Sequence, residues 1–178
     1  SSGRSVTVAP SNIHVRTGTE QFARGGQVSK VRRIVKHPGF DPETLDNDLA
    51  LLELKSPVYV DDPIRLVTYD TEEALACLGS AGTVTGWSSQ DELRCGQAQQ
   101  PELSAIETRI VEPSECSGTS DPIVMTNNKI CAAKAPSEGN RCQLDLGSPL
   151  LVSNGRGGYV QAGIVSQGNG CDSHPATA

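Results

Sequence analysis

Short runs of alternating apolar and polar residues, each bounded by Gly or Pro, make up most of this chain. The runs with a period of two cover residues 5–9, 13–16, 27–37, 64–67, 81–87, 103–111, 129–133, 149–153 and 159–166. Helical periodicity is confined to residues 71–75 and to 113–116, where Pro113 suits a first helical position. Asn154-Gly155 lies between two of the runs and predicts a hairpin turn. The pattern predicts an all-β protein built as barrels or as a sandwich.

One stretch combines a polar entry with an apolar run. Asp46, Asn47 and Asp48 precede the apolar residues 49–54, which are too few for an independent helix. They predict a buried or half-buried strand that is entered from a tight loop. A carboxylate at Asp48 is then expected to be hydrogen-bonded or paired, because burying a lone charge is costly. An ordinary Asx-turn at the start of a strand explains the same pattern.

Composition excludes several classes of partner and cofactor. The formal charge is −6, from 15 Lys and Arg against 21 Asp and Glu, which argues against a nucleic-acid surface. No apolar run approaches the roughly 20 residues that cross a bilayer. The three His are scattered and no two Cys form a CxxC pair, so no zinc site is expected. Motifs for phosphate, dinucleotide and metal binding are missing too, so we expect no cofactor.

Cysteine usage predicts the compartment. Six Cys in a loop-rich chain favour disulfides, and hence an extracellular or secreted protein. No charged-then-apolar signal segment begins at Ser1, so a secreted protein would be represented here in a processed or truncated form.

Several segments together resemble the trypsin/chymotrypsin-like serine proteases (peptidase S1), in the order and spacing of that family. They are residues 12–18, 35–40, 46–54, 63–67, 82–87, 128–132, 142–143 with 147–150, and 163–168. The resemblance implies a double antiparallel β-barrel, incomplete at both ends. Residues 1–178 would form one trypsin-like domain. Within it, 1–67 would be a partial first barrel, 68–80 the linker, and 81–178 a second barrel that lacks its C-terminal strand and helix.

The same resemblance places a degenerate catalytic set on this chain. A serine protease needs a Ser nucleophile, a His base, an Asp that orients the His, and backbone N–H groups for the oxyanion. Asp48 matches the triad Asp. Leu146 stands at the nucleophile position and Leu144 at the oxyanion Gly position. The catalytic His would lie ahead of the first residue, and His14, His37 and His174 do not match its position.

The remaining implied site residues concern the activation contact and the substrate cleft. Asp145 matches the Asp that receives the new N-terminal amine; with Ser1 in place of an apolar terminus, it is expected to be unpaired, solvated or bonded to local N–H groups. Asn140 falls where trypsins carry the Asp that selects basic residues, so a basic preference is not supported. By the same resemblance, the edge of the substrate cleft would be formed by Ser166, Gln167 and Gly168.

The family also implies a disulfide pattern. Cys116 would pair with Cys131, and Cys142 with Cys171. Cys77 and Cys95 are then left to pair with each other.

Two functions from different classes fit these residues. One is a non-catalytic binding or regulatory module, which Leu144 and Leu146 favour because truncation cannot change internal residues. The other is an incomplete chain of a secreted endopeptidase that hydrolyses peptide bonds. An unrelated β-sandwich is the third, weaker interpretation.

A protein or peptide ligand is the expected partner. Open barrel edges also predict self-association, or partial disorder over residues 1–67.

Overall fold

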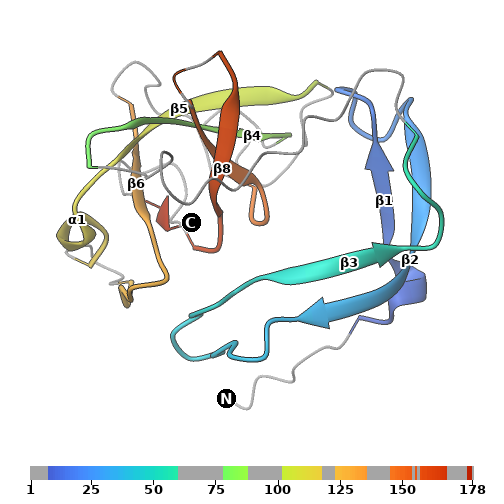
Figure 1. Cartoon of the computed structure of the whole chain (residues 1–178), viewed down its shortest axis with the longest axis horizontal. Helices are drawn as coiled ribbons and strands as arrows, with labels where there is room; N and C mark the ends of the chain where they lie inside the picture. The colour runs from blue at the N-terminus through green and yellow to red at the C-terminus, as the bar shows by residue number, and fades with distance from the viewer. Residues whose placement is uncertain are drawn as a thin grey trace, which may run out of the picture.

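The computed structural model describes residues 8–59, 78–87, 102–117, 123–135, 145–153, 155, 157–167 and 176–177. Almost every regular element in these ranges is a strand, and the strands form two antiparallel sheets (Figure 1). The all-β prediction is therefore confirmed, and the arrangement is consistent with the fold that the resemblance implied. Within the described ranges neither sheet closes on itself into a barrel.

The first sheet has the order β1-β2-β3 and follows a 3-10 turn at Pro10–Asn12. Its strands are β1 (His14–Thr17), β2 (Gln27–Lys36) and β3 (Ala50–Leu54). The turn between β1 and β2 needs glycine at Gly26, which has φ +60°. A Cβ there would lie 2.2 Å from the Thr17 carbonyl oxygen, closer than any real contact.

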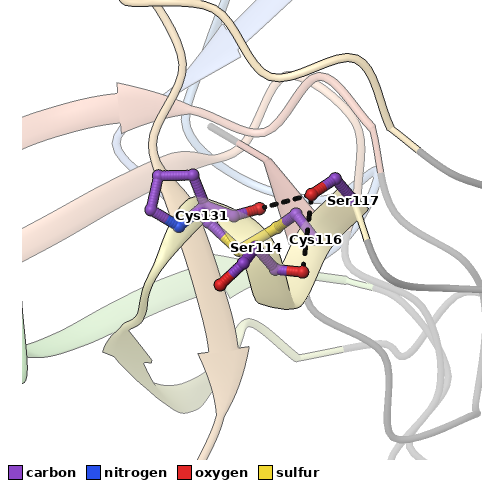
Figure 2. Close-up of a disulfide and its surroundings, with 5 residues drawn as sticks. Ser114, Cys116, Ser117 and Cys131 are labelled. Atoms are coloured by element: carbon purple, nitrogen blue, oxygen red, sulfur yellow. Dashed lines mark hydrogen bonds between the residues drawn. A yellow bond between two sulfur atoms is a disulfide. The ribbon is translucent and has the colours of Figure 1, made fainter.

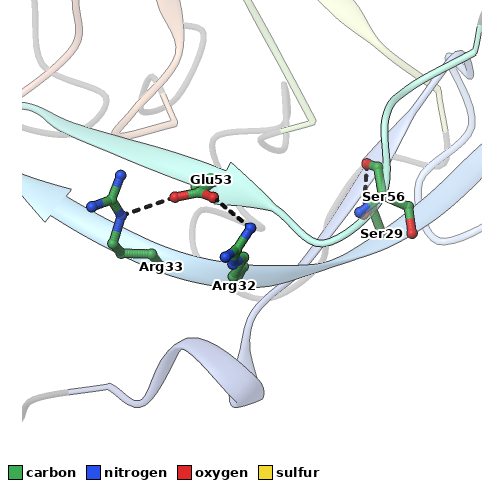
Figure 3. A network of polar contacts seen from close by, with 5 residues as sticks. All are labelled: Ser29, Arg32, Arg33, Glu53 and Ser56. Carbon is green, nitrogen blue, oxygen red and sulfur yellow. Dashed lines mark hydrogen bonds and ion pairs between the residues drawn. The ribbon is translucent and has the colours of Figure 1, made fainter.

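A bulge in β2 turns two neighbouring arginines toward one carboxylate. The β2–β3 register shifts between Val31 and Arg33, so the extra residue Arg32 has no partner of its own in β3. Figure 3 shows the consequence: Arg32 and Arg33 both contact Glu53, with N–O distances of 3.2 and 2.9 Å. Both arginine side chains are about 70% exposed, so the pairs contribute little to stability.

The strand expected at 49–54 is present as β3, but the expectation that it is buried or half-buried is wrong for most of its residues. Leu51 is 70% exposed and Leu52 is 43% exposed, and Leu54 at the end of β3 is only half-buried. The physical reason is that β3 lies at the edge of the three-stranded sheet of the described residues, and its side chains line cavities in place of a packed core. An apolar run therefore occupies a strand without being enclosed by a core.

Only residues 8 and 9 of the strand expected at 5–9 are described, and they do not form a strand. Val8 and Ala9 lie outside any strand, because Pro10 begins the 3-10 turn. The other expected strands of the first half agree with β1 and β2 within one or two residues. The segment 64–67, the helical turn at 71–75 and most of the linker 68–80 lie outside the described residues.

The second sheet has the order β8-β7-β4-β5-β6-β9. Its strands are β4 (Ala81–Gly86), β5 (Ser104–Ile110), β6 (Cys131–Lys134), β7 (Pro149–Ser153), β8 (Tyr159–Ile164) and β9 (Ala176–Thr177). The sequence predicted all of them except β9. The hairpin turn between β7 and β8 is confirmed, and Gly155 and Gly157 in it have φ +71° and +80°.

The buried clusters of the described residues lie on this second sheet, whereas Val31 of β2 is a fully buried residue of the first sheet. Leu150 of β7 is fully buried and packs with Val84, Ala132 and Val165. The alternation in β5, where every second residue is buried, shows why a period of two was visible in the sequence.

Helix α1 (Pro113–Ser117) is tied to β6 by a disulfide between Cys116 and Cys131 (Figure 2). This is the pairing that the resemblance implied. Both cysteines are nearly inaccessible and pack with Val111 and Ile123. The Cys77–Cys95 and Cys142–Cys171 pairings lie outside the described residues.

Removing this disulfide should destabilise the second half. The two cysteines are separated by 15 residues, and closing a loop of that length contributes about 3 kcal/mol in the chain-entropy account. A Cys116→Ala/Cys131→Ala variant is expected to lose about that amount, measured by urea unfolding. Ser117→Ala is the control, because Ser117 is exposed and only its hydroxyl bonds to the Pro113 and Ser114 carbonyls change. Equal stability of both variants would contradict the prediction.

Candidate functional site

Several polar contacts join the two halves within the described residues, and the first of them centres on Trp87. The Trp87 indole N–H donates to the Glu20 carbonyl oxygen across 2.9 Å, and its ring lies 6.3 Å from that of Phe22. The backbone N–H of Leu103 donates to the same Glu20 oxygen. Trp87 is the sole tryptophan of the chain, so its fluorescence reports on this contact.

The second contact brings the loop before β3 against the residues that lead into β6. Thr126 Oγ1 donates to Oδ1 of Asp46, and Asn128 Nδ2 donates to Oδ2 of Asp46 at 3.2 Å. Asn128 also approaches Oδ1 of Asn47 at 3.4 Å. Asp46 is therefore the carboxylate that joins the halves here, whereas the sequence drew attention to Asp48.

Lys129 completes this second contact. Its ammonium group donates to the carbonyl oxygens of Thr44 and Val124 and, at 3.3 Å, to Oε1 of Gln167. It thus connects the first half to Gln167, which the resemblance had placed at the edge of the cleft. The sequence analysis did not predict site roles for Thr126, Asn128 and Lys129. Polar residues in a loop have no repeating pattern from which their contacts could be predicted.

Asp48 lies at the centre of the junction. Ser166 Oγ donates to Oδ2 of Asp48 at 2.7 Å, although 118 residues separate the two. This is the hydrogen bond that the sequence expected of Asp48. The expected burial is absent, since Asp48 is exposed.

Two cavities flank the Asp48–Ser166 pair. The Lys129 cavity has a volume of about 570 Å³ and lies between β3 and β8; its walls include Leu45, Leu51, Ile130 and Ala162. The Leu146 cavity has a volume of about 610 Å³. Its walls include Phe40, Leu52, Leu146, Gly147 and Val165, with Lys36 among its lining residues. Both cavities share Asp48, Leu49, Ile164 and Ser166.

The turn that carries Leu146 is held at both sides. Trp87 donates its backbone N–H to Oδ2 of Asp145, so Asp145 accepts from an N–H group 58 residues away. Gly86 permits this approach, since a Cβ there would lie 2.4 Å from the same oxygen. Gly147 donates its N–H to the Val165 carbonyl oxygen. Leu146 at the tip is 63% exposed.

The structure therefore brings Asp48, Leu146 and Ser166 to one cavity. Asn140, Leu144 and Gly168 lie outside the described residues. Ser148, two residues after Leu146, is buried, and its backbone oxygen accepts from Val165.

The described histidines do not line either cavity. His14 is an exposed residue of β1. The ring of His37 is engaged locally, where Nδ1 accepts from the Gly39 N–H at 3.1 Å. His174 lies outside the described residues. In the described ranges no group of three or more His, Cys, Asp or Glu side chains is arranged to hold a metal ion, and no helix is both long and apolar enough to cross a membrane.

The Asp46 contact makes the junction sensitive to acid. The Thr126 hydrogen bond, supported by Asn128 and by the charge of Lys129, holds the pKa of Asp46 below its ordinary value of 3.8. Because the folded-state pKa is lowered, the stabilisation is present above pH 3.8 and is lost as pH falls through the folded pKa. Asp46→Asn should therefore lower stability at pH 6, and the loss should be smaller at pH 2.

This prediction is checked by urea unfolding followed through Trp87 fluorescence at both pH values. Glu115→Gln, in the exposed part of α1, is the control and should leave the pH dependence unchanged. A destabilisation by Asp46→Asn that is the same at both pH values would contradict the assignment.

Comparison with known proteins identifies similar chains. The trypsin family model matches residues 4–178. Trypsin beta of Drosophila erecta is 30% identical over 168 residues, covering 93% of this chain and 62% of that protein. Trypsin-3 of Homo sapiens is 30% identical, covering 93% and 49%. Trypsin 5G1 of Aedes aegypti is 31% identical, covering 95% and 61%. The chain thus spans about half to three-fifths of the length of these relatives.

Proposed function

The chain belongs to the trypsin family, and we propose that it is a non-catalytic member that acts as a binding or regulatory module. The observation that carries the proposal is Leu146. It lies at the nucleophile position of the family pattern and lines the same cavity as Asp48. A leucine side chain has no atom that can attack a carbonyl carbon, so no acyl-enzyme can form at this residue.

Leu144 supports the same conclusion from the sequence. The family has glycine at this position, where a backbone N–H binds the developing oxyanion and the missing side chain leaves room for the substrate. A leucine side chain would crowd that space. Both substitutions are internal to the chain, so they do not depend on which residues precede or follow it.

The Asp48–Ser166 pair supports a binding role. The Ser166 hydroxyl donates to Oδ2 of Asp48 at 2.7 Å, and two cavities with largely apolar walls flank the pair. A polar pair at the centre of a largely apolar cleft is typical of a ligand site.

The alternative function is that of a larger secreted endopeptidase that hydrolyses peptide bonds and of which this chain is a part. The fraction of its relatives that the chain covers, 49–62%, favours this alternative. It would require a nucleophile other than residue 146. Secretion fits either function, because the Cys116–Cys131 disulfide is stable in an oxidising compartment.

The test is an amidase assay combined with a serine-directed phosphonate. The unaltered chain is expected to hydrolyse neither peptide nor ester substrates and to remain unlabelled, as judged by intact mass. An active trypsin treated in parallel is the control for the reagent. Stoichiometric labelling of any serine, Ser148 included, would overturn the proposal.

A further inference from the structure

We infer that the outer face of the first sheet binds a sulfated polysaccharide. The cationic side chains that would bind it are all exposed and are called here the basic face: Arg16, Lys30, Arg32, Arg33 and Lys55. None of them lines the Lys129 cavity or the Leu146 cavity. Binding at this face therefore goes beyond the proposed function and does not depend on it.

Strand pairing between β1 and β2 places the first part of the basic face. Ser29 and Val31 of β2 are buried, so the side chain of Lys30 between them points away from the core. His14 of β1 is the partner of Lys30 in the ladder. Arg16 follows His14 by two residues, so it projects from the same face of the sheet.

The basic face continues from β2 toward β3. The backbone N–H of Lys55 donates to the Lys30 carbonyl oxygen at 2.8 Å, which places Lys55 opposite Lys30. The bulge in β2 adds Arg32 and Arg33, and the two arginines share Glu53 (Figure 3). One carboxylate cannot neutralise two guanidinium groups, so a positive charge remains at this point as well.

The charge of the basic face is not balanced locally. Strands β1, β2 and β3 contain one carboxylate, Glu53, although the whole chain has a formal charge of −6. Within the described residues neither Lys30 nor Lys55 has an ion pair. Like charges directly opposite each other destabilise a sheet. Stability therefore does not explain the pair, whereas a bound polyanion would relieve its repulsion.

The spacing of the cations favours a linear polymer over a small anion. Neighbouring strands lie about 5 Å apart, and alternate residues of one strand lie about 7 Å apart. The cations thus form a flat array, and a polymer with many fixed anions can contact several of them at once. The planar guanidinium groups of Arg32 and Arg33 bind oxyanions in a bidentate manner, which suits sulfate groups.

A sulfated polysaccharide fits this array better than a nucleic acid does. Strands β1 to β3 contain no Phe, Tyr or Trp on which bases could stack. The helices of the described ranges have three and five residues, too few to read a groove. The Cys116–Cys131 disulfide is stable in an oxidising compartment, and sulfated polysaccharides are the abundant polyanions outside the cell.

The probe is a fully sulfated heparin octasaccharide, with its desulfated form as the matched control, and calorimetry measures both affinities. We expect the sulfated form to bind at 50 mM NaCl and to lose at least about tenfold in affinity at 200 mM, because binding releases counterions. The desulfated form has fewer anions and should bind at least about tenfold more weakly. Equal binding of both forms, or no binding of the sulfated one, would overturn the inference. A short DNA duplex that binds as tightly would overturn the choice of a polysaccharide.

Three variants test the location of the site. Lys30→Gln should lower the affinity about tenfold at 50 mM NaCl and reduce the slope of log affinity against log salt by about 1. Arg109→Gln removes the same charge from an exposed position of β5 and should change neither quantity. Glu53→Gln frees Arg32 and Arg33, so it should tighten binding at least about twofold.

The urea unfolding midpoint of each variant shows that the fold is retained. Lys30 and Arg109 are exposed and the Glu53 ion pairs are largely solvated, so the three midpoints should match that of the unaltered chain. Equal losses in Lys30→Gln and Arg109→Gln would mean that only net charge matters and would overturn the assignment to this face. Weaker binding by Glu53→Gln would overturn it too.

Discussion

Leu144→Gly combined with Leu146→Ser is expected to leave the 178-residue chain without measurable amidase activity. The two substitutions would place a glycine and a serine where the resemblance assigns the oxyanion donor and the nucleophile, but they would supply no base. His14 is on the exposed side of β1, and the Nδ1 atom of His37 accepts from Gly39. Losing the histidine of a triad lowers turnover by about 10⁶ in a well-studied triad enzyme, which is the deficit expected here.

The matched experiment joins an Ala-Ala-His-Cys segment ahead of Ser1 in the same double variant. Turnover of a chromogenic amide is expected to require that segment as well as both substitutions. The measurement is kcat/KM, with the unaltered chain as the baseline. Triad-type activity from the double substitution alone would show that a histidine of this chain reaches residue 146, contrary to the described positions of His14 and His37.

Leu150→Ala is expected to cost about 2–5 kcal/mol in the free energy of unfolding. Leu150 is 0% exposed and packs with Val84, Ala132 and Val165, so its loss leaves a cavity in the core of the second sheet. The strands around it cannot collapse freely, because β7 is hydrogen-bonded to β4 on one side and to β8 on the other. Urea unfolding measures the change.

Leu78→Ala is the matched control, since the same side chain is 57% exposed there. It should change stability by no more than about 0.5 kcal/mol. A similar loss in both variants would mean that Leu150 is not the centre of a packed core.

The strands were predictable because a period of two survives wherever one face of a strand is buried. In β5 that alternation is nearly perfect, with Ile106, Thr108 and Ile110 buried. The run at 49–54 predicted a strand correctly but predicted its burial wrongly, for a related reason. Apolar composition alone does not report whether a covering layer exists, and Leu51 is 70% exposed.

The candidate site was only partly predictable. Asp48 and Leu146 could be proposed because each falls in a run of residues that resembles a family motif. The contacts of Asp46 with Thr126 and Asn128 could not, since they join loops about 80 residues apart and depend on how the two sheets are placed. The same holds for Lys129, whose three acceptors come from separate segments.

The strand order of the second sheet bears on how the chain folds during synthesis. Strand β4 pairs with β5, the next strand along the chain, and with β7, where Val152 follows its partner Gly82 by 70 residues. At about 5–20 residues per second a ribosome needs roughly 4–14 s to make that interval. Throughout this time one edge of β4 remains unpaired. In the first sheet, by contrast, each strand pairs with the strand synthesised directly before or after it. The growing chain therefore presents Val84 and an open edge to chaperones until β7 emerges.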